Sequence, residues 1–191
     1  MNRQSIKSQL KSDFINAEFN CLSSYDQFVS GLKQVGIENI LNLDSTNFIN
    51  AQNLVALPAF DASVSAKYDS AVGLFISDSV FNFNNVALNI VKLPGERNMK
   101  SELVIDSIRY LNFKSYELNL SMAADENMVS GQLKIDSLNV NGVGTGLAEI
   151  KIDMLPEKIM GTLLVADTSG SPVYQLAVDA TKENNRVLFR T

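Results

Sequence analysis

Two aspartates occupy equivalent steps of a repeated pattern and are the first candidates for chemistry. Asp106 and Asp136 each lie in the tripeptide Ile-Asp-Ser, 30 positions apart. Two carboxylates held at a fixed separation are what acid and base catalysis on a glycosidic bond requires. Equivalent positions of a repeat, however, more often form equivalent bends or solvent-facing sites. We therefore interpret both aspartates as structural.

A glycine cluster could cradle a phosphate group. It lies within GQLKIDSLNVNGVGTGLAEIKIDM, residues 131–154. A phosphate loop of the dinucleotide-binding type places its glycines between a strand and a helix, whose N-terminus holds the anion. Here the glycines are followed by LAEIKIDM, which alternates as a strand does. The cluster is therefore predicted to form an extended turn or bulge in a hairpin.

Other routes to catalysis or metal binding find little support. The chain has no histidine, so neither imidazole-based catalytic groups nor the usual catalytic zinc sites are available. Its single cysteine, Cys21, falls on the apolar face of a predicted helix and is expected to be an inert thiol. We assign no catalytic residue, metal ligand or cofactor, and we expect the protein not to be an enzyme.

Length and charge exclude further classes. The 191 residues, 46% of them apolar, suffice for one domain with a hydrophobic core. The net charge of -5 argues against nucleic acid as a partner. No apolar run reaches the roughly 18 residues of a membrane span. Localisation stays open: extracellular if a leader has been removed, otherwise cytoplasmic or virion.

The first 36 residues are predicted to form a long amphipathic helix. Apolar or small side chains recur at spacings of three and four, which return to one face of a helix. Gly36 is placed to end it. The residues of this stripe are Ile6, Leu10, Phe14, Ala17, Cys21, Leu22, Tyr25, Phe28, Leu32 and Val35.

After a connector at residues 37–60, the period of the apolar residues changes to two. Residues 61–191 are predicted to form β-hairpins that repeat about every 30 positions, because Leu103 and Ile105 are matched by Leu133 and Ile135. Consecutive hairpins most simply form an antiparallel meander. The predicted fold is thus a single α+β domain, with the N-terminal helix packed on a curved antiparallel meander of six to eight strands.

Residues 20–37, NCLSSYDQFVSGLKQVGI, resemble the N-terminal segment of the insect juvenile hormone-binding and takeout proteins. Residues 131–154 and SGSPVYQLAV, which begins at residue 169, are similar to the strands of that family. The resemblance implies the tubular lipid-binding fold, in which a curved sheet wraps a long helix around an apolar ligand. The second cysteine and the C-terminal helix of the family are absent here. Repeated hairpins also occur in bacterial lipid-transfer proteins of the AsmA type.

The leading functional hypothesis is a non-enzymatic carrier of a lipid-like or isoprenoid-like ligand, held in an apolar cavity between helix and sheet. Its competitor is a structural or assembly subunit, such as a virion or surface-layer component, that self-associates through exposed sheet edges. Simple packing of the same side chains against one another would leave no cavity. The predicted ligand-binding residues are Phe14, Leu22, Phe28, Leu32, Leu103, Ile105, Leu118, Leu120, Leu133, Ile135, Ile150, Ile152, Leu163 and Val165.

Overall fold

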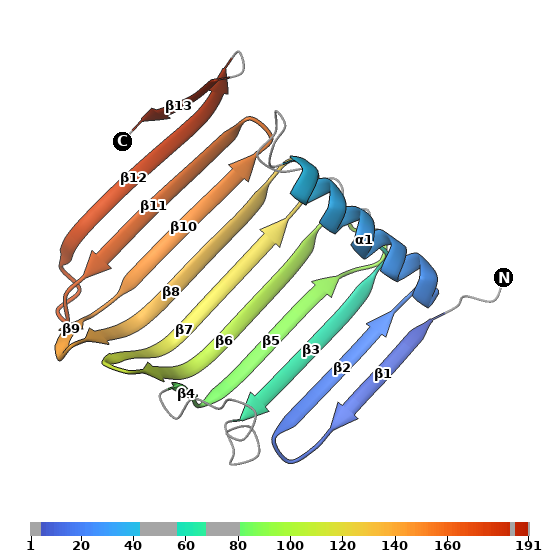
Figure 1. Ribbon diagram of the computed structural model, residues 1–191, viewed down its shortest axis with the longest axis horizontal. Helices are drawn as coiled ribbons and strands as arrows, with labels where there is room; N and C mark the ends of the chain where they lie inside the picture. Colours follow the sequence, from blue (N-terminus) through green and yellow to red (C-terminus); the bar gives the residue numbers. More distant parts are fainter. Residues whose placement is uncertain (1–4, 43–56, 68–80, 184–185, 191) are drawn as a thin grey trace.

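One antiparallel sheet of 13 strands makes up most of the protein (Figure 1). The computed structural model describes residues 5–42, 57–67, 81–183 and 186–190. Neighbouring strands follow the order β1-β2-β3-β5-β6-β7-β8-β10-β11-β12-β13, with the short β4 paired to β6 and β9 paired to β8. The order almost repeats that of the chain, so the sheet is a meander as predicted. The predicted count of six to eight strands was wrong.

The first six strands in chain order are β1 (Ile6–Lys11), β2 (Ile15–Cys21), β3 (Phe60–Lys67), β4 (Phe81–Phe83), β5 (Asn85–Lys92) and β6 (Met99–Tyr110). The next four are β7 (Phe113–Ala124), β8 (Val129–Val140), β9 (Val143–Thr145) and β10 (Ala148–Leu155). The last three are β11 (Lys158–Ala166), β12 (Pro172–Glu183) and β13 (Arg186–Arg190). The single helix in the described part is α1 (Tyr25–Asn42).

The predicted helix over residues 1–36 is wrong, and the α+β class falls with it. Residues 6–21 instead form the hairpin of β1 and β2. Ile15, Ala17, Phe19 and Cys21 also alternate with polar residues, and this period of two fits the sheet. Pairing of β2 with β3 decides between the two periods, because it places all four side chains on the apolar face of the sheet.

Helix α1 begins only at Tyr25, well inside the stripe predicted from Ile6 to Val35, and it continues past the predicted end at Gly36 to Asn42. Ser24 caps it: the Ser24 hydroxyl accepts from the Gln27 amide at 3.3 Å, and the Gln27 side chain accepts from the Ser24 amide at 3.4 Å. Figure 1 shows α1 crossing one end of the strands from β2 towards β8. Its 18 residues span about 27 Å, close to the roughly 24 Å of five interstrand spacings. The helix therefore runs across the strands, along one end of the sheet.

The hairpin repeat is confirmed, and it places equivalent residues of successive repeats in line across the sheet. Leu103 pairs with Leu120 of β7, which pairs with Leu133 of β8. Leu133 pairs with Ile150 of β10, which pairs with Leu163 of β11. Positions 30 apart therefore lie two strands apart, in one line across the sheet and on the same face.

The glycine cluster forms a turn, as predicted. Asn141 and Gly142 both have positive φ and reverse the chain between β8 and β9. Gly146 then carries the chain towards β10, and its amide donates to the Ala166 carbonyl at 3.0 Å. A strand follows rather than a helix, so the site lacks the anion-binding helix N-terminus of a phosphate loop.

The turn from β11 to β12 is organised by Asp167. One carboxylate oxygen of Asp167 accepts from the Ser169 hydroxyl at 2.6 Å and from the amides of Ser169 and Ser171 at 2.8 and 2.9 Å. These hydrogen bonds lower the pKa of Asp167 below its ordinary value of 3.8, because they favour the ionised form.

The depressed pKa of Asp167 predicts an acid-sensitive turn. A carboxyl whose pKa is lower in the folded state stabilises folding above its unfolded pKa, and this stabilisation is lost as the pH falls through the folded pKa. The melting temperature of the wild type is expected to exceed that of Asp167→Asn at neutral pH, with the difference shrinking at pH values below 3.8. Thermal melts of both proteins across this range test it. A difference that stays constant with pH would contradict the assignment.

Candidate ligand-binding face

The apolar side chains of the sheet gather on one face, in rows that run across the strands. The most regular row, the Leu103 row, takes one aliphatic residue from each of ten strands. No polar residue interrupts it. Its members are Leu10, Ala17, Val64, Leu88, Leu103, Leu120, Leu133, Ile150, Leu163 and Leu176.

Two further rows flank the Leu103 row on the same face. The Ile105 row consists of Ile15, Ala66, Val86, Ile105, Leu118, Ile135, Ala148, Val165 and Tyr174. The Ser101 row consists of Ser8, Phe19, Ala62, Ile90, Ser101, Met122, Gly131, Ile152, Gly161 and Val178. We call these three rows the open rows.

The row nearest to α1, the Cys21 row, differs from the open rows in being largely covered. Its members are Ile6, Cys21, Phe60 and Lys92, followed by Met99, Ala124, Val129, Met154, Ile159, Ala180 and Phe189. Six of them are buried: Cys21, Phe60, Lys92, Ala124, Val129 and Ala180.

The start of α1 explains part of the cover over the Cys21 row. The ring of Phe28 lies 5.0 Å from that of Phe19 and 5.3 Å from that of Phe60, measured between centroids. Leu57, which precedes β3, packs against Cys21 and Phe60. The described core therefore lies along one end of the sheet and not over its centre.

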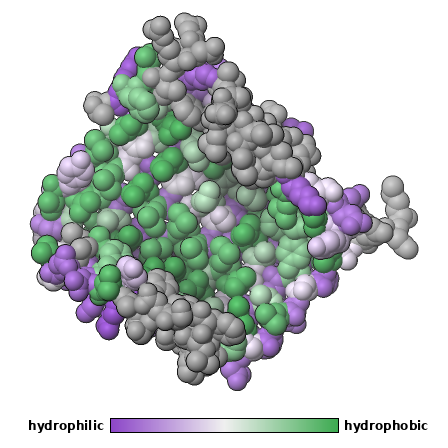
Figure 2. Space-filling model, in the orientation of Figure 1, coloured by the Kyte–Doolittle hydropathy of each residue, from purple (hydrophilic) through white to green (hydrophobic). Residues whose placement is uncertain are grey.

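The open rows remain accessible to solvent. No member of the Leu103 row or the Ile105 row is buried. Ile150 and Ile152 are 37% and 39% exposed, and Met122 is 42% exposed between its small neighbours Ser101 and Gly131. Figure 2 shows apolar residues filling the middle of this face. The footprint of these ten strands and three rows on the sheet is about 43 by 20 Å, on the order of 800 Å², and an exposed apolar patch of several hundred Å² on a monomer often marks a binding site.

All ten strand residues predicted to bind a ligand lie together in the open rows. Leu103, Leu120, Leu133, Ile150 and Leu163 belong to the Leu103 row. Ile105, Leu118, Ile135 and Val165 belong to the Ile105 row, and Ile152 belongs to the Ser101 row. The sequence pattern thus identified one shared surface.

The four residues expected to face them from a helix do not form a matching surface. Phe14 lies in the turn between β1 and β2, at the end of the sheet far from α1. Leu22 precedes α1 and is 53% exposed, and Leu32 on α1 is 45% exposed. Phe28 alone packs on the sheet, against Phe19 and Phe60. Phe14 and Leu22 lie outside α1, so the four residues do not form one helix face as predicted.

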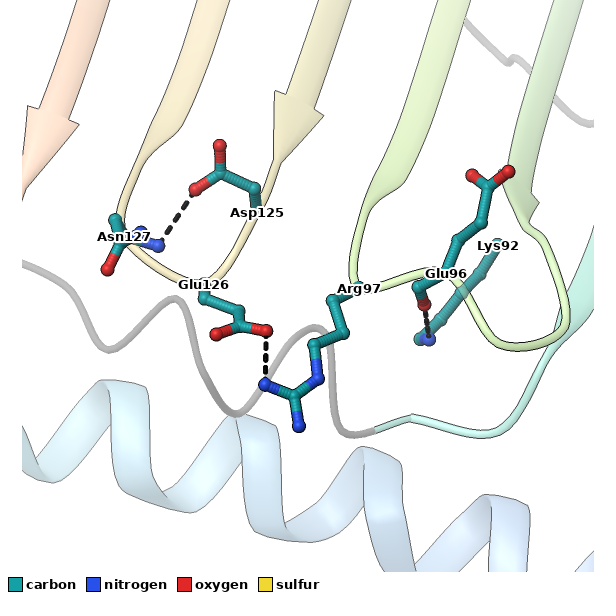
Figure 3. A network of polar contacts seen from close by, with 6 residues as sticks. All are labelled: Lys92, Glu96, Arg97, Asp125, Glu126 and Asn127. Carbon is teal, nitrogen blue, oxygen red and sulfur yellow. Dashed lines mark hydrogen bonds and ion pairs between the residues drawn. The ribbon is translucent and has the colours of Figure 1, made fainter.

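Lys92 is a functional candidate that the sequence interpretation missed. It occupies the apolar phase of β5, two residues after Ile90, and is only 6% exposed. Its ammonium donates to the Glu96 carbonyl at 3.0 Å (Figure 3) and forms no ion pair with a described residue. Burial lowers the pKa of Lys92, and the Glu96 charge partly opposes this effect. The sequence signal that could have identified Lys92 is its position among the apolar residues of an alternating strand.

The opposite face of the sheet is polar. Asn20 donates to Asp61 at 2.8 Å, and Lys158 lies 2.7 Å from Asp179. A groove of about 550 Å³ lies on this face, floored by small residues of β7 and β8 and rimmed by charged residues of β6 and β10. None of the fourteen predicted ligand-binding residues lines it.

The two aspartates of the repeat lie on the polar face and are separated by Glu117. Ile105 pairs with Leu118 and Leu118 with Ile135, so Asp106, Glu117 and Asp136 follow one another on β6, β7 and β8. Asp106 accepts from Asn85, and Asp136 lies 2.7 Å from Lys134. A hydrogen bond with Asp136 and the charge of that group raise the pKa of Glu117. In the described part of the chain, no three acidic or cysteine side chains are arranged to hold a metal ion.

Among the residues that the structure describes, no helix has both the length and the apolar composition needed to cross a membrane. Comparison of the chain with protein-family models, with curated proteins and with solved structures finds no match.

Proposed function

We propose that this protein binds a lipid-like hydrophobic molecule on the open rows and is not an enzyme. This proposal rests on the Leu103 row. The row is aliphatic across ten strands, yet none of its residues is buried. A folded protein rarely leaves so large an apolar surface uncovered unless something binds there. The ligand would lie on the face beside α1, rather than in a closed chamber between helix and sheet.

The side chains of the open rows suit a flexible alkyl ligand. Leu, Ile, Val and Met offer contacts without direction, so a chain can lie on them in many registers. Covering about 300 Å² of this surface would contribute roughly 7 kcal/mol at 25 cal/mol per Å², before the cost of immobilising the ligand. Carboxylates such as Asp106 and Asp136 lie on the other face, so no catalytic step is included in this proposal.

A second candidate is assembly through the same face. About 800 Å² per partner is the size of a standard protein interface, so a second copy could cover the open rows. Pairing through sheet edges is less favoured, because both edge strands are short and carry cations: Lys7 and Lys11 on β1, Arg190 on β13. Native mass spectrometry of protein from its natural source separates the candidates, since a carrier retains lipid whereas a subunit forms a defined assembly.

Charge placed in the open rows should abolish ligand binding. Leu120→Asp puts a carboxylate in the centre of the Leu103 row and is expected to weaken binding of a fluorescent polyene fatty acid at least tenfold, because the alkyl chain would have to desolvate that charge. The matched control is Ser121→Asp, one residue further along β7 on the polar face. Fluorescence titration of both variants measures the change. Equal affinities for the two variants would refute the proposed site.

A further inference from the structure

Two cations lie directly opposite each other at the end of the sheet farthest from α1. Arg109 of β6 pairs with Lys114 of β7, beside the turn that joins the two strands (Figure 1). Both side chains are exposed, and neither forms an ion pair or a hydrogen bond with a described residue. Like charges in directly opposed positions destabilise a sheet. An anion bound between these two cations would offset their repulsion.

The Arg109–Lys114 pair belongs to the same face of the sheet as the open rows. Arg109 follows Ile105 by four residues on β6, and side chains an even number of residues apart in a strand share a face. Lys114 precedes Leu118, the partner of Ile105, by four residues on β7. The two cations therefore lie on the apolar face, two rows beyond the Ile105 row.

The described residues beside the Arg109–Lys114 pair on this face supply no carboxylate. The outer strand partners of the two cations are neutral, Asn82 for Arg109 and Asn139 for Lys114. The carboxylates nearest to the pair along β6, β7 and β8 belong to the polar face: Asp106, Glu117 and Asp136. Within the described part of the chain, the pair is thus a positive site without a counter-ion.

The polarity of this face falls in steps from the Arg109–Lys114 pair towards α1. The row next to the pair bears hydroxyl groups, from Ser107, Tyr116 and Ser137. The Ile105 row and the Leu103 row follow it, and both are largely aliphatic. Charged, hydroxyl-bearing and aliphatic rows therefore succeed one another in the order of headgroup and alkyl chain in an acidic lipid.

Building on the proposed function, we propose that Arg109 and Lys114 bind the phosphate monoester headgroup of a single-chain lipid whose alkyl chain runs along β6 and β7 over the open rows. A phosphate monoester carries a charge of about -1.5 to -2 at pH 7, which matches two cations, whereas a carboxylate matches only one. The guanidinium of Arg109 also has the planar geometry to donate two parallel hydrogen bonds to phosphate oxygens.

The length of the face suits an ordinary alkyl chain. From Ser107 to Ser101, β6 extends by about 20 Å. The alkyl chains of one leaflet fill half of a bilayer core of about 30 Å, or roughly 15 Å. A chain that starts at the hydroxyl-bearing row therefore ends over the open rows, before it reaches the covered Cys21 row at Met99.

The closing experiment compares dodecyl phosphate, laurate and dodecanol, which differ in headgroup charge, by isothermal titration calorimetry below their micelle concentrations. The wild-type chain is expected to bind dodecyl phosphate at least tenfold more tightly than dodecanol at neutral pH and low salt, with laurate between them. Arg109→Gln combined with Lys114→Gln should remove this preference and leave dodecanol binding unchanged, whereas Lys114→Arg should keep it. The matched control combines Lys100→Gln with Lys151→Gln, which removes the same charge from the polar face and should keep the preference.

The outcomes separate this site from the proposed function. Equal wild-type affinities for dodecyl phosphate and dodecanol, or a preference that survives the paired substitution of Arg109 and Lys114, would overturn the headgroup site and leave hydrophobic binding intact. Laurate bound as tightly as dodecyl phosphate would overturn the phosphate assignment. Binding of none of the three compounds to the wild type would overturn both proposals. The paired variant is expected to melt no lower than the wild type, because it removes a like-charge repulsion.

Discussion

Val129→Asp is expected to lower the free energy of unfolding far more than Ile150→Asp does. Val129 is 1% exposed in the covered Cys21 row, between Ala124 and Met154. A carboxylate there would be buried without a partner, at a cost of about 3–5 kcal/mol. That is a large part of the stability of a typical domain. Ile150 is 37% exposed in the Leu103 row, so an aspartate there keeps its water and should cost about 1 kcal/mol or less.

Urea denaturation followed by circular dichroism measures both variants. The comparison is matched, since each variant exchanges a β-branched residue in a strand for the same poor strand former. Similar losses of unfolding free energy would mean that the open rows are in fact covered, and the proposed ligand site would fail with them.

Gly146→Ala is expected to cost about 2–3 kcal/mol, because the added methyl group has no room. A Cβ at Gly146 would lie 2.0 Å from the carbonyl oxygen of Asp167 and 2.6 Å from its carbonyl carbon. Both are backbone atoms, so relief requires the turn between β11 and β12 to move. That movement would strain the hydrogen bond from Gly146 to Ala166.

Gly144→Ala is the matched control within the same glycine cluster. A Cβ at Gly144 would lie 3.7 Å from the Asn139 side chain, an ordinary contact. This substitution should change the unfolding free energy by about 0.5 kcal/mol or less. Thermal or urea unfolding of the two variants distinguishes them. Equal changes in unfolding free energy would show that the nearby turn between β11 and β12 does not require a glycine at position 146.

The sequence predicted the hairpins between β6 and β12 because every local signal agreed there. Alternation, the turn residues and the repeat of Leu103 at Leu133 and Leu163 all indicate strands of one sheet. Pro94-Gly95, Asn141-Gly142 and Ser169-Gly170 are typical turn pairs, and each lies in a connection between two strands. What alternation could not show is whether a second layer covers the apolar face, since that depends on elements outside the strands.

The N-terminal region failed because two periods fit the same residues. Apolar residues from Ile6 to Cys21 can be read at spacings of three and four or at a spacing of two. Pairing with β3, some 40 residues away in the chain, decides for the strands. No local pattern contains that contact. The helix does exist, but it begins at Tyr25, after the Ser24 cap.

The candidate site was only half predictable. Ten aliphatic residues of the open rows follow from alternation, because side chains of equal phase share a face. Lys92 was missed because a lysine at the end of a strand is usually taken as solvated. Lys92 lies two residues after Ile90 and therefore on the same face of the sheet. This spacing, and not its residue type, indicated that it belongs to the apolar face.

Because each 30-residue repeat corresponds to two strands of the sheet, the width of the sheet depends on the number of repeats. Each 30-residue unit adds two strands, so it widens the surface by about 9.6 Å while supplying the same aliphatic positions again. Inserting or deleting one whole unit would therefore change the reach of the surface in fixed steps and leave its chemistry unaltered. Under the proposed function, a sheet built from more such units would offer a longer surface to the ligand, and one built from fewer a shorter surface.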